Sequence, residues 1–301
     1  MPSCDHICIC VCTFRRPIEL QQLLGKLECL RTDNLFTYSI VIADNDRDRS
    51  AEATVVKFRG SSKIPVEYHC EPEQNIALAR NKALQNARGE FVALIDDDEF
   101  PSEDWLLNLL EACRTYASDG VLGPVKPFFD REPPKWLLRG RFYERLAHPT
   151  GHVLEWWNCP TSNVLLKRAI LLGDDGPFRR EFGSGGEDLD FFRRMIERGH
   201  LFVWCNEAAI YEVIPPVRWG RGFMLRRALL RGQVSLAHPA GRGRKLVASL
   251  LAVPLYTVSL PLCYVLGEHV FMRYLIKDCD HLGRLLAACG IKTIKQKYIL
   301  D

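Results

Sequence analysis

The chain has 301 residues, of which 47% are hydrophobic and 26% charged. This composition excludes a disordered chain and allows one large domain with an appendage, or two domains. The net charge of +3 conceals a division, because residues 216–301 carry 14 Lys/Arg against 4 Asp/Glu, whereas residues 1–215 carry 26 against 33. An acidic N-terminal part and a basic C-terminal part indicate different partners for the two.

The cysteines and the N-terminus indicate a reducing compartment. Residues 1–6 contain no basic segment followed by an apolar run, so we expect no signal peptide. Twelve cysteines without such a signal predict free thiols. Cys8, Cys10 and Cys12 share one face of a predicted strand, but no C-x-x-C pair occurs, so buried thiols are favoured over a zinc site.

Strands and helices alternate along the first 116 residues. Short apolar runs predict strands at residues 7–11, 38–43, 66–69 and 91–95. The spacing of apolar residues between and after them predicts helices that begin at Pro17, cover 51–58 and 76–87, and run from Ser102, as the cap, to about Tyr116. Gly89 is expected to end the third helix. Such alternation builds an α/β fold with a mainly parallel sheet and flanking helices.

The strand predicted at residues 91–95 stops at four carboxylates, Asp96, Asp97, Asp98 and Glu99. The carboxyl ends of strands in an open α/β sheet line the ligand crevice. Adjacent carboxylates repel one another by about 1 kcal/mol or more for each close pair, and Mg²⁺ or Mn²⁺ would offset this repulsion. If the backbone stays extended, Asp96 and Asp98 face one side and Asp97 the other. A solvated acidic turn is the alternative.

Other polar residues end neighbouring strands at the same edge. Asp44 follows the strand at residues 38–43, and Thr13 and Arg15 follow the first strand, so these three could line one nucleotide crevice with Asp96. The chain contains no G-x-G-x-x-G after the first strand and no G-x-x-x-x-G-K-[ST]. A phosphate group would therefore need a cation or arginines.

A second segment that can carry chemistry is Gly183–Asp188, which leads into a helix predicted to end at Gly199. Leu189, Phe192 and Ile196 give this helix one apolar face. Glu187 and Asp188 at its start can be ordinary helix caps or dipole partners. The irregular segment 120–150 and its aromatic residues either cover an active site or pack in the core, and residues 161–166 read as a strand that starts near Ser162 and Asn163.

The basic C-terminal part contains an uncharged run, Leu246–Leu266, interrupted by Pro254 and Pro261. Its 21 residues are long enough to span a bilayer, with the basic flank on the cytoplasmic side. The prolines and hydroxyls favour a re-entrant or interfacial helix pair over a true span or a buried helix of a soluble protein. Arginines beside this run fit anionic lipid headgroups or the diphosphate of a lipid-linked acceptor. Nucleic acid is not expected as a partner, because its binding needs no apolar run.

Taken together, these segments resemble the family 2 glycosyltransferases, which have the Rossmann-like GT-A fold. The resemblance covers roughly residues 5–215, and the tail resembles that of bacterial exopolysaccharide glycosyltransferases of the succinoglycan-pathway type. The matching segments, in chain order, are Thr13-Phe14-Arg15-Arg16-Pro17, Asp44-Asn45, Asn75-Ile76-Ala77-Leu78-Ala79-Arg80-Asn81, Leu94-Ile95-Asp96-Asp97-Asp98, Gly176-Pro177-Phe178 and Gly186-Glu187-Asp188.

The resemblance implies a role for each matching site residue. Asp96 and Asp98 stand at the D-x-D positions, the first near the nucleotide and the second on the metal. Asp188 stands at the position of the catalytic base, and Glu187 is expected to help hold the acceptor. The remaining substrate-binding positions are those of the uracil contact, Asp44, of the nucleotide pocket, Thr13 and Arg15, and of a further substrate contact, Arg80. Many relatives have a histidine near residues 211–212 as a metal ligand; Glu212 stands there instead, which leaves a third protein ligand open.

The expected function is therefore inverting transfer of a sugar from a nucleotide-sugar, with a UDP-sugar as donor, to a saccharide, expected to be lipid-linked, with Mn²⁺ or Mg²⁺ as cofactor. The expected place is the cytoplasmic face of the inner membrane, as a peripheral or monotopic protein in bacterial surface or exopolysaccharide synthesis. Residues 1–215 would form the GT-A domain and 216–301 the helical membrane-associating region. Two alternatives stay open: a sugar-nucleotide pyrophosphorylase, although its glycine-rich, lysine-bearing loop is absent, and a non-catalytic membrane-bound GT-A scaffold, which would be expected to have lost one of Asp96, Asp98 or Asp188.

Overall fold

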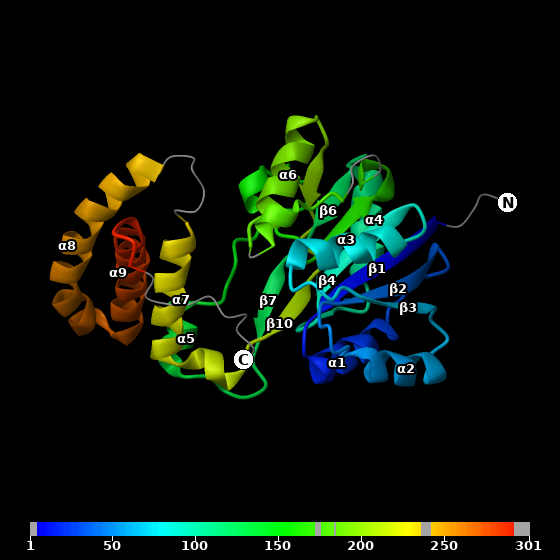
Figure 1. The fold of residues 1–301 in the computed structure, drawn as a ribbon, viewed down its shortest axis with the longest axis horizontal. Helices are drawn as coiled ribbons and strands as arrows, with labels where there is room; N and C mark the ends of the chain where they lie inside the picture. The colour runs from blue at the N-terminus through cyan, green and yellow to red at the C-terminus, as the bar shows by residue number, and fades with distance from the viewer. Residues whose placement is uncertain (1–4, 172–175, 184, 236–241, 292–301) are drawn as a thin grey trace. The chain divides into compact units, whose positions relative to one another are not determined.

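A computed structural model of the chain describes residues 5–171, 176–183, 185–235 and 242–291 (Figure 1). The chain forms two compact units. The first comprises the chain up to Pro127 together with Arg145–Glu212, and the second comprises Phe128–Glu144 together with the chain from Val213 onward. The chain passes from the first unit to the second after Glu212, close to the boundary expected at residue 215. The short segment 128–144, expected in the first domain, belongs to the second unit.

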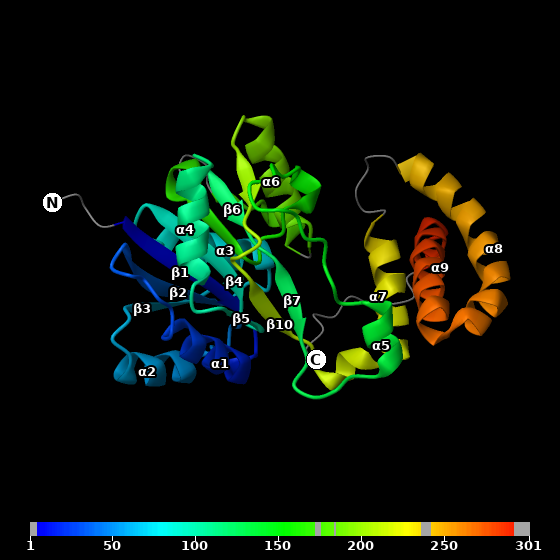
Figure 2. The ribbon, with the colours of Figure 1, turned by 180° about the vertical axis from the view of Figure 1, so that it is seen from behind.

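The first unit is built on a seven-stranded sheet in the order β3-β2-β1-β4-β8-β6-β9 (Figures 1 and 2). All neighbours pair in parallel except β8, which is antiparallel to both β4 and β6. A second, smaller sheet has three strands in the order β5-β10-β7. The strands are β1 Asp5–Thr13, β2 Phe36–Asp44, β3 Val66–Cys70, β4 Phe91–Asp96, β5 Glu99–Pro101, β6 Gly120–Leu122, β7 Val125–Phe128, β8 Val164–Lys167, β9 Phe202–Trp204 and β10 Ile210–Val213.

Helices cover both faces of the large sheet, and side chains of each strand alternate between two cores. In β1, Ile7 and Ile9 face the core that contains α1 and α4, whereas Cys8 and Cys10 face the core that contains α3 and α6. This two-sided burial explains why the strands are continuous apolar runs in the sequence. The helices of this unit are α1 Pro17–Leu27, α2 Glu52–Ser61, α3 Ile76–Asn86, α4 Trp105–Thr115 and α6 Glu187–Glu197. The eleven described cysteines are free, as predicted.

Three local expectations were wrong, each because tertiary contacts decided the outcome. Helix α3 ends at Asn86, and Gly89, with a φ of +97°, instead makes the turn into β4, where an added Cβ would lie 2.4 Å from the carbonyl oxygen of His6. Ser102 does not cap α4: the N-cap residue is Asp104, and Ser102 lies two residues earlier, where its N–H donates to the carbonyl of Ala209 beside the β5–β10 ladder. In the apolar face predicted for α6, Leu189 is 37% exposed, whereas Phe192 is buried and Ile196 packs against the same core. Phe191 and Met195 complete the buried face.

The second unit is helical, with α7 and α8 both packed against α9. Arg231 of α7 donates two hydrogen bonds to the carboxylate of Asp280 on α9, at 2.9 and 2.6 Å. Helix α8 continues through Pro254 and Pro261. The apolar run 246–266 is therefore part of one continuous helix, and the pair of helices expected from its prolines is not formed within it. The helices are α5 Lys135–Gly140, α7 Arg221–Val234, α8 Arg242–Leu266 and α9 Glu268–Ala288.

Candidate active site

The acid-tipped strand ends as predicted, but its carboxylates do not alternate. Strand β4 ends at Asp96, and the next two residues form a turn that Glu99 closes by accepting the N–H of Asp96 at 3.0 Å. One guanidinium nitrogen of Arg16 lies 3.1 Å from Asp97 Oδ1 and 3.1 Å from Asp98 Oδ2. Asp97 and Asp98 therefore share a cation. The expected alternation had placed them on opposite sides, but it does not hold because the extended backbone stops at Asp96, two residues before Asp98.

Asp97 is the more buried of the two carboxylates that share Arg16. Its Oδ2 accepts a hydrogen bond of 2.8 Å from the hydroxyl of Thr13, and its side chain is 6% exposed, compared with 18% for Asp98. Burial raises the pKa of Asp97 to about 7, against the opposing effect of Arg16. Thr13 thus acts on the strand end through Asp97, and Asp98 remains the better exposed carboxylate.

Arg16 was missed as a site residue, although it lies in the segment that carries the family resemblance. The reason is local backbone geometry: Arg15 has a φ of +54°, in the left-handed region that non-glycine residues seldom occupy. Arg15 pairs with Asp46 at 3.1 Å and Asp48 at 3.4 Å, while the next residue, Arg16, reaches the acid cluster. Adjacent arginines in a loop cannot be distinguished in this way from sequence spacing.

Arg80 joins the acid-tipped strand to the start of α6. Its guanidinium forms an ion pair with Glu187 and lies 3.7 Å from Asp96 Oδ1. Both Arg80 and Glu187 are buried, and Glu187 Oε2 has no hydrogen-bond partner among the described residues. That oxygen is buried, so the expected role of Glu187 in holding the acceptor stays a prediction.

The loop before α6 is held against the start of α3. The side chain of Asn75 caps α3 by accepting the Leu78 N–H at 3.1 Å and donates to the carbonyl of Arg180 at 3.0 Å. A Cβ on Gly183 would lie 2.1 Å from Asn75 Cγ, so only glycine permits this approach. The adjacent Ser184 lies outside the described residues.

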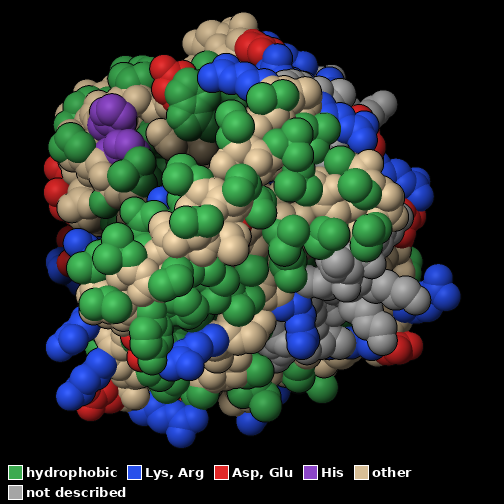
Figure 3. All heavy atoms as spheres, turned by 90° about the vertical axis from the view of Figure 1, so that its left-hand side faces the viewer, with side chains coloured by type: hydrophobic (Ala, Val, Ile, Leu, Met, Phe, Trp, Pro, Cys, Tyr) green, Lys and Arg blue, Asp and Glu red, His purple; other side chains and the backbone are tan. Residues whose placement is uncertain are grey.

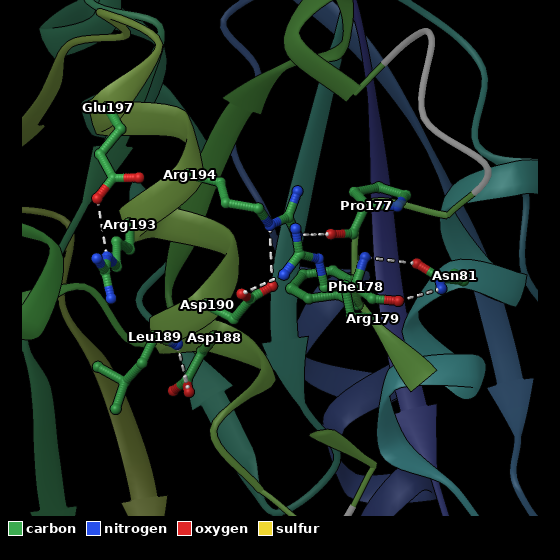
Figure 4. A network of polar contacts seen from close by, with 10 residues as sticks. All are labelled: Asn81, Pro177, Phe178, Arg179, Asp188, Leu189, Asp190, Arg193, Arg194 and Glu197. Atoms are coloured by element: carbon green, nitrogen blue, oxygen red, sulfur yellow. Dashed lines mark hydrogen bonds and ion pairs between the residues drawn. The ribbon is translucent and has the colours of Figure 1, made fainter. Parts of the chain in front are cut away.

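A polar network fixes α6 itself (Figure 4). Asp190 accepts hydrogen bonds from Arg194 at 2.9 Å and Arg179 at 3.3 Å. Arg194 also donates to the carbonyl of Pro177, and Asn81 of α3 makes two hydrogen bonds with the backbone of Phe178. These contacts fix the first turn of α6, from which Asp188 projects away from the network (Figure 4).

Asp188 is half-buried, and its Oδ1 accepts the N–H of Leu189 at 2.8 Å. It follows Glu187 directly in the chain, and Glu187 is joined through Arg80 to the strand end that bears Asp96. The structure therefore brings together Glu187 and Asp96, which are some ninety residues apart, and the role of the adjacent Asp188 as catalytic base stays a prediction. The N-cap position of α6 is Gly186, and Glu187 and Asp188 lie in the first turn, where Asp188 accepts a backbone N–H, so the alternative that they are dipole partners of the helix stays open.

Asp44 lies apart from this group and is fully buried. It accepts hydrogen bonds from the N–H groups of Asp46 and Ala51 and from the hydroxyl of Tyr68, at 3.1, 2.9 and 2.8 Å. Burial raises its pKa against the effect of these donors. The protein thus uses three of the roughly four acceptor positions of the Asp44 carboxylate. These bonds show that Asp44 organises the loop after β2, and the contact of Asp44 with uracil stays a prediction.

The residues at the strand end fit a hard divalent cation that is completed by substrate. Among the described residues, no group of three or more His, Cys, Asp or Glu side chains is arranged to hold a metal ion. Glu212, opposite Glu99 in the β5–β10 ladder, is held by Arg145. Mg²⁺-type ions are commonly bound by one or two carboxylates plus phosphate oxygens, which is the donor set that Asp98 and a diphosphate would supply.

Comparison with known proteins gives this geometry a context. Residues 8–171 match the family model described as glycosyl transferase family 2. The chain is 33% identical, over 97% of its length and 95% of the other protein, to the succinoglycan biosynthesis protein ExoM of Rhizobium meliloti (strain 1021). It is 23% identical to the hyaluronan synthase of Pasteurella multocida, over 71% of this chain and 25% of that protein.

Two solved structures share the fold. Residues 1–349 of S. aureus TarS in complex with UDP match with a TM-score of 0.54 at 17% identity, over 98% of this chain and 94% of that one. The mannosyltransferase PcManGT from Pyrobaculum calidifontis, in complex with GDP-Man and Mn²⁺, matches with a TM-score of 0.60 at 17% identity, over 94% and 88%. At this identity the likeness shows the fold alone.

Proposed function

This chain belongs to glycosyl transferase family 2 and has the GT-A fold, and from that premise we propose that it transfers a sugar with inversion from a UDP-sugar to a lipid-linked saccharide in bacterial surface or exopolysaccharide synthesis. The observation that carries the proposal is the bridge made by Arg80. One guanidinium pairs with Asp96 at the end of β4 and with Glu187, the residue before Asp188. This bridge supports the proposal that the acid at the donor end and the proposed catalytic base, Asp188, belong to one site.

The proposed mechanism assigns one step to each part of the site. The acceptor hydroxyl loses its proton to Asp188 as its oxygen attacks the anomeric carbon. The bond to the nucleoside diphosphate breaks in the same displacement, so an α-linked donor gives a β-linked product. Arg16 and Arg80 carry positive charge toward the strand end where negative charge develops on the leaving diphosphate.

Asp98 would hold Mn²⁺ or Mg²⁺ on the donor diphosphate. When bound, such an ion stabilises the charge of the leaving group. Asp96 would contact the nucleotide, while Thr13, through its bond to Asp97, keeps the turn in place. Arg15, paired with Asp46 and Asp48, would have to leave these partners to reach a nucleotide.

The direct test is release of UDP from a panel of UDP-sugars, with Mn²⁺ or with EDTA. We expect one or a few donors to give Mn²⁺-dependent UDP release that increases when a lipid extract of the producing cells is added. A pyrophosphorylase would instead form or consume pyrophosphate, and a non-catalytic scaffold would release nothing. No UDP release from any donor would contradict the proposal.

We further propose that α8 lies in the membrane interface, on the cytoplasmic face of the inner membrane. By length and composition, α8 is the one helix among the described residues that could cross a membrane, yet 11% of its most apolar window is buried, too little for a core helix. Nine of its apolar side chains are exposed, and Figure 3 shows hydrophobic side chains gathered on the face where α8 lies. They are Val247, Leu250, Leu251, Leu255, Val258, Leu262, Tyr264, Val265 and Leu266.

The opposite side of α8 favours an in-plane helix over a span. Thr257 donates to Asp278 of α9 at 3.0 Å, and Ser249 contacts His281 of α9 at 3.0 Å. A helix with one polar, packed side and one apolar, exposed side is typical of interfacial binding. The exposed Arg242 and Arg244 at its start complement anionic lipid headgroups.

Replacing Val258, which is 80% exposed, by glutamate tests this membrane contact. We expect Val258→Glu to lower the fraction bound to anionic vesicles by about tenfold or more. The variant removes a side chain whose burial in the membrane would contribute about 1.5–3 kcal/mol to binding, and it places a charge there. The matched control is Val56→Glu on α2, where Val56 is 60% exposed. Equal flotation of the two variants with vesicles would refute the assignment of this face.

A further inference from the structure

A pocket of about 300 Å³ in the first unit has Asp188 in its wall. Its volume is at the lower end of the range of about 300–1,000 Å³ that is common for small-molecule sites. Three apolar side chains of the wall are left in contact with water: Leu146, Trp157 and Leu189 are 68%, 57% and 37% exposed. An apolar surface beside a predicted catalytic carboxylate has to be accounted for by something that covers it during the reaction.

Trp157 is linked through Trp156 to the helix that bears Asp188. Its ring meets that of Trp156 edge to face, with centroids 5.3 Å apart. The guanidinium of Arg193, on α6, lies 5.8 Å from the centroid of Trp156. Because Asp188 is in the first turn of the same helix, the indole and the carboxylate are positioned by one element.

The basic side chains in the pocket wall carry little free positive charge. Arg145, in the wall, is paired with Glu212, so its charge is compensated. His148, also in the wall, is stacked on His152, with ring centroids 4.4 Å apart. Burial is the larger cause that lowers the pKa of His148, and the neighbouring His152 is the smaller one. At neutral pH His148 is therefore a neutral hydrogen-bonding group, and the pocket holds no unpaired positive charge that would select an anion.

We propose that this pocket binds a neutral hexose residue of the acceptor, with Trp157 as the surface on which its ring stacks. This inference rests on the proposed function. A hexose has an apolar face of C–H groups and an edge of hydroxyls, which matches an exposed indole bordered by the polar side chains of Arg145, His148 and Asp188. A ring stacked on Trp157 would present a hydroxyl to Asp188, so Trp157 is a specificity-determining residue for the acceptor.

The test uses octyl β-glycosides of glucose, galactose, N-acetylglucosamine and glucuronic acid, below their micellar range, as acceptor probes. Binding is followed by saturation-transfer NMR without donor, and transfer by UDP release with donor. We expect a neutral glycoside to bind better than the glucuronide. Trp157→Ala should raise the KM for the neutral glycoside about tenfold, with UDP affinity and acceptor-free hydrolysis of the donor as the readouts that a general loss of folding would also change. Trp157→Phe should keep most of the affinity for the glycoside.

The control is Phe128→Ala, which removes an aromatic side chain that is 42% exposed and lies outside the pocket wall. Absence of glycoside binding by the wild-type protein, a preference for the glucuronide, or an unchanged KM in Trp157→Ala would overturn the inference. Such results with intact UDP release would leave the proposed function standing. Loss of UDP release in the wild-type protein would instead contradict the proposed function itself.

Discussion

Replacing Asp188 by asparagine is expected to lower the rate of sugar transfer by about 10²- to 10⁴-fold, the usual contribution of a positioned general base. Asparagine keeps the shape and can still accept the Leu189 N–H that Asp188 accepts at 2.8 Å. The amide cannot take up the proton of the acceptor hydroxyl. UDP binding should be unchanged, because the donor contacts are assigned to the end of β4. Steady-state UDP release and calorimetric titration with UDP measure the two properties.

Glu197→Gln is the matched control for Asp188→Asn. It removes one negative charge from the same helix, at the opposite end, where Glu197 is 58% exposed and pairs with Arg193. Its transfer rate should stay within about twofold of the wild-type rate, because surface ion pairs contribute about 0–1 kcal/mol. A near-normal rate in Asp188→Asn would exclude Asp188 as the base, and an equal loss in both variants would point to a general effect on α6.

Replacing Asp98 by alanine is expected to weaken UDP binding in the presence of Mn²⁺ by about ten- to hundredfold, since contacts with charged groups contribute about 1.5–3 kcal/mol. Asp98 is the more exposed of the two carboxylates that share Arg16, and Arg16 keeps Asp97 as its partner in the variant. The weak binding measured with EDTA should change little. Isothermal titration of UDP under the two conditions separates metal-dependent from metal-independent affinity.

Asp5→Ala controls for the loss of an acid that pairs with an arginine. Asp5 lies 2.7 Å from Arg114, at the opposite end of β1 from Thr13, so its removal should leave Mn²⁺-dependent UDP affinity unchanged. Electron paramagnetic resonance of Mn²⁺ provides a readout that does not depend on turnover: free Mn²⁺ should increase in Asp98→Ala with UDP present. Identical titrations for wild type and Asp98→Ala would remove the D-x-D assignment.

The chain order of strands and helices in the first unit was predictable because hydrophobic periodicity depends on local spacing. Strand β4 was expected at residues 91–95 and covers Phe91–Asp96, and helix α3 was expected at 76–87 and covers Ile76–Asn86. Where predictions failed, a distant segment competed with local preference. The N–H of Ser102 donates to the carbonyl of Ala209 beside the β5–β10 ladder. At position 89 the backbone comes so close to the carbonyl oxygen of His6 that only glycine fits.

The sequence by itself determined the acid-tipped strand, the carboxylates at the start of α6 and the apolar run of the tail, because each is a local pattern of charge and hydrophobicity. Only the tertiary structure decided which arginines meet which acids. Arg16 rather than Arg15 reaches Asp97 and Asp98, and Arg80 pairs with Asp96 and also with Glu187, which lies 107 residues further along the chain than Arg80. It also decided that α8 leaves its apolar side exposed. Such partners depend on how the chain returns to the same place, which residue spacing does not encode.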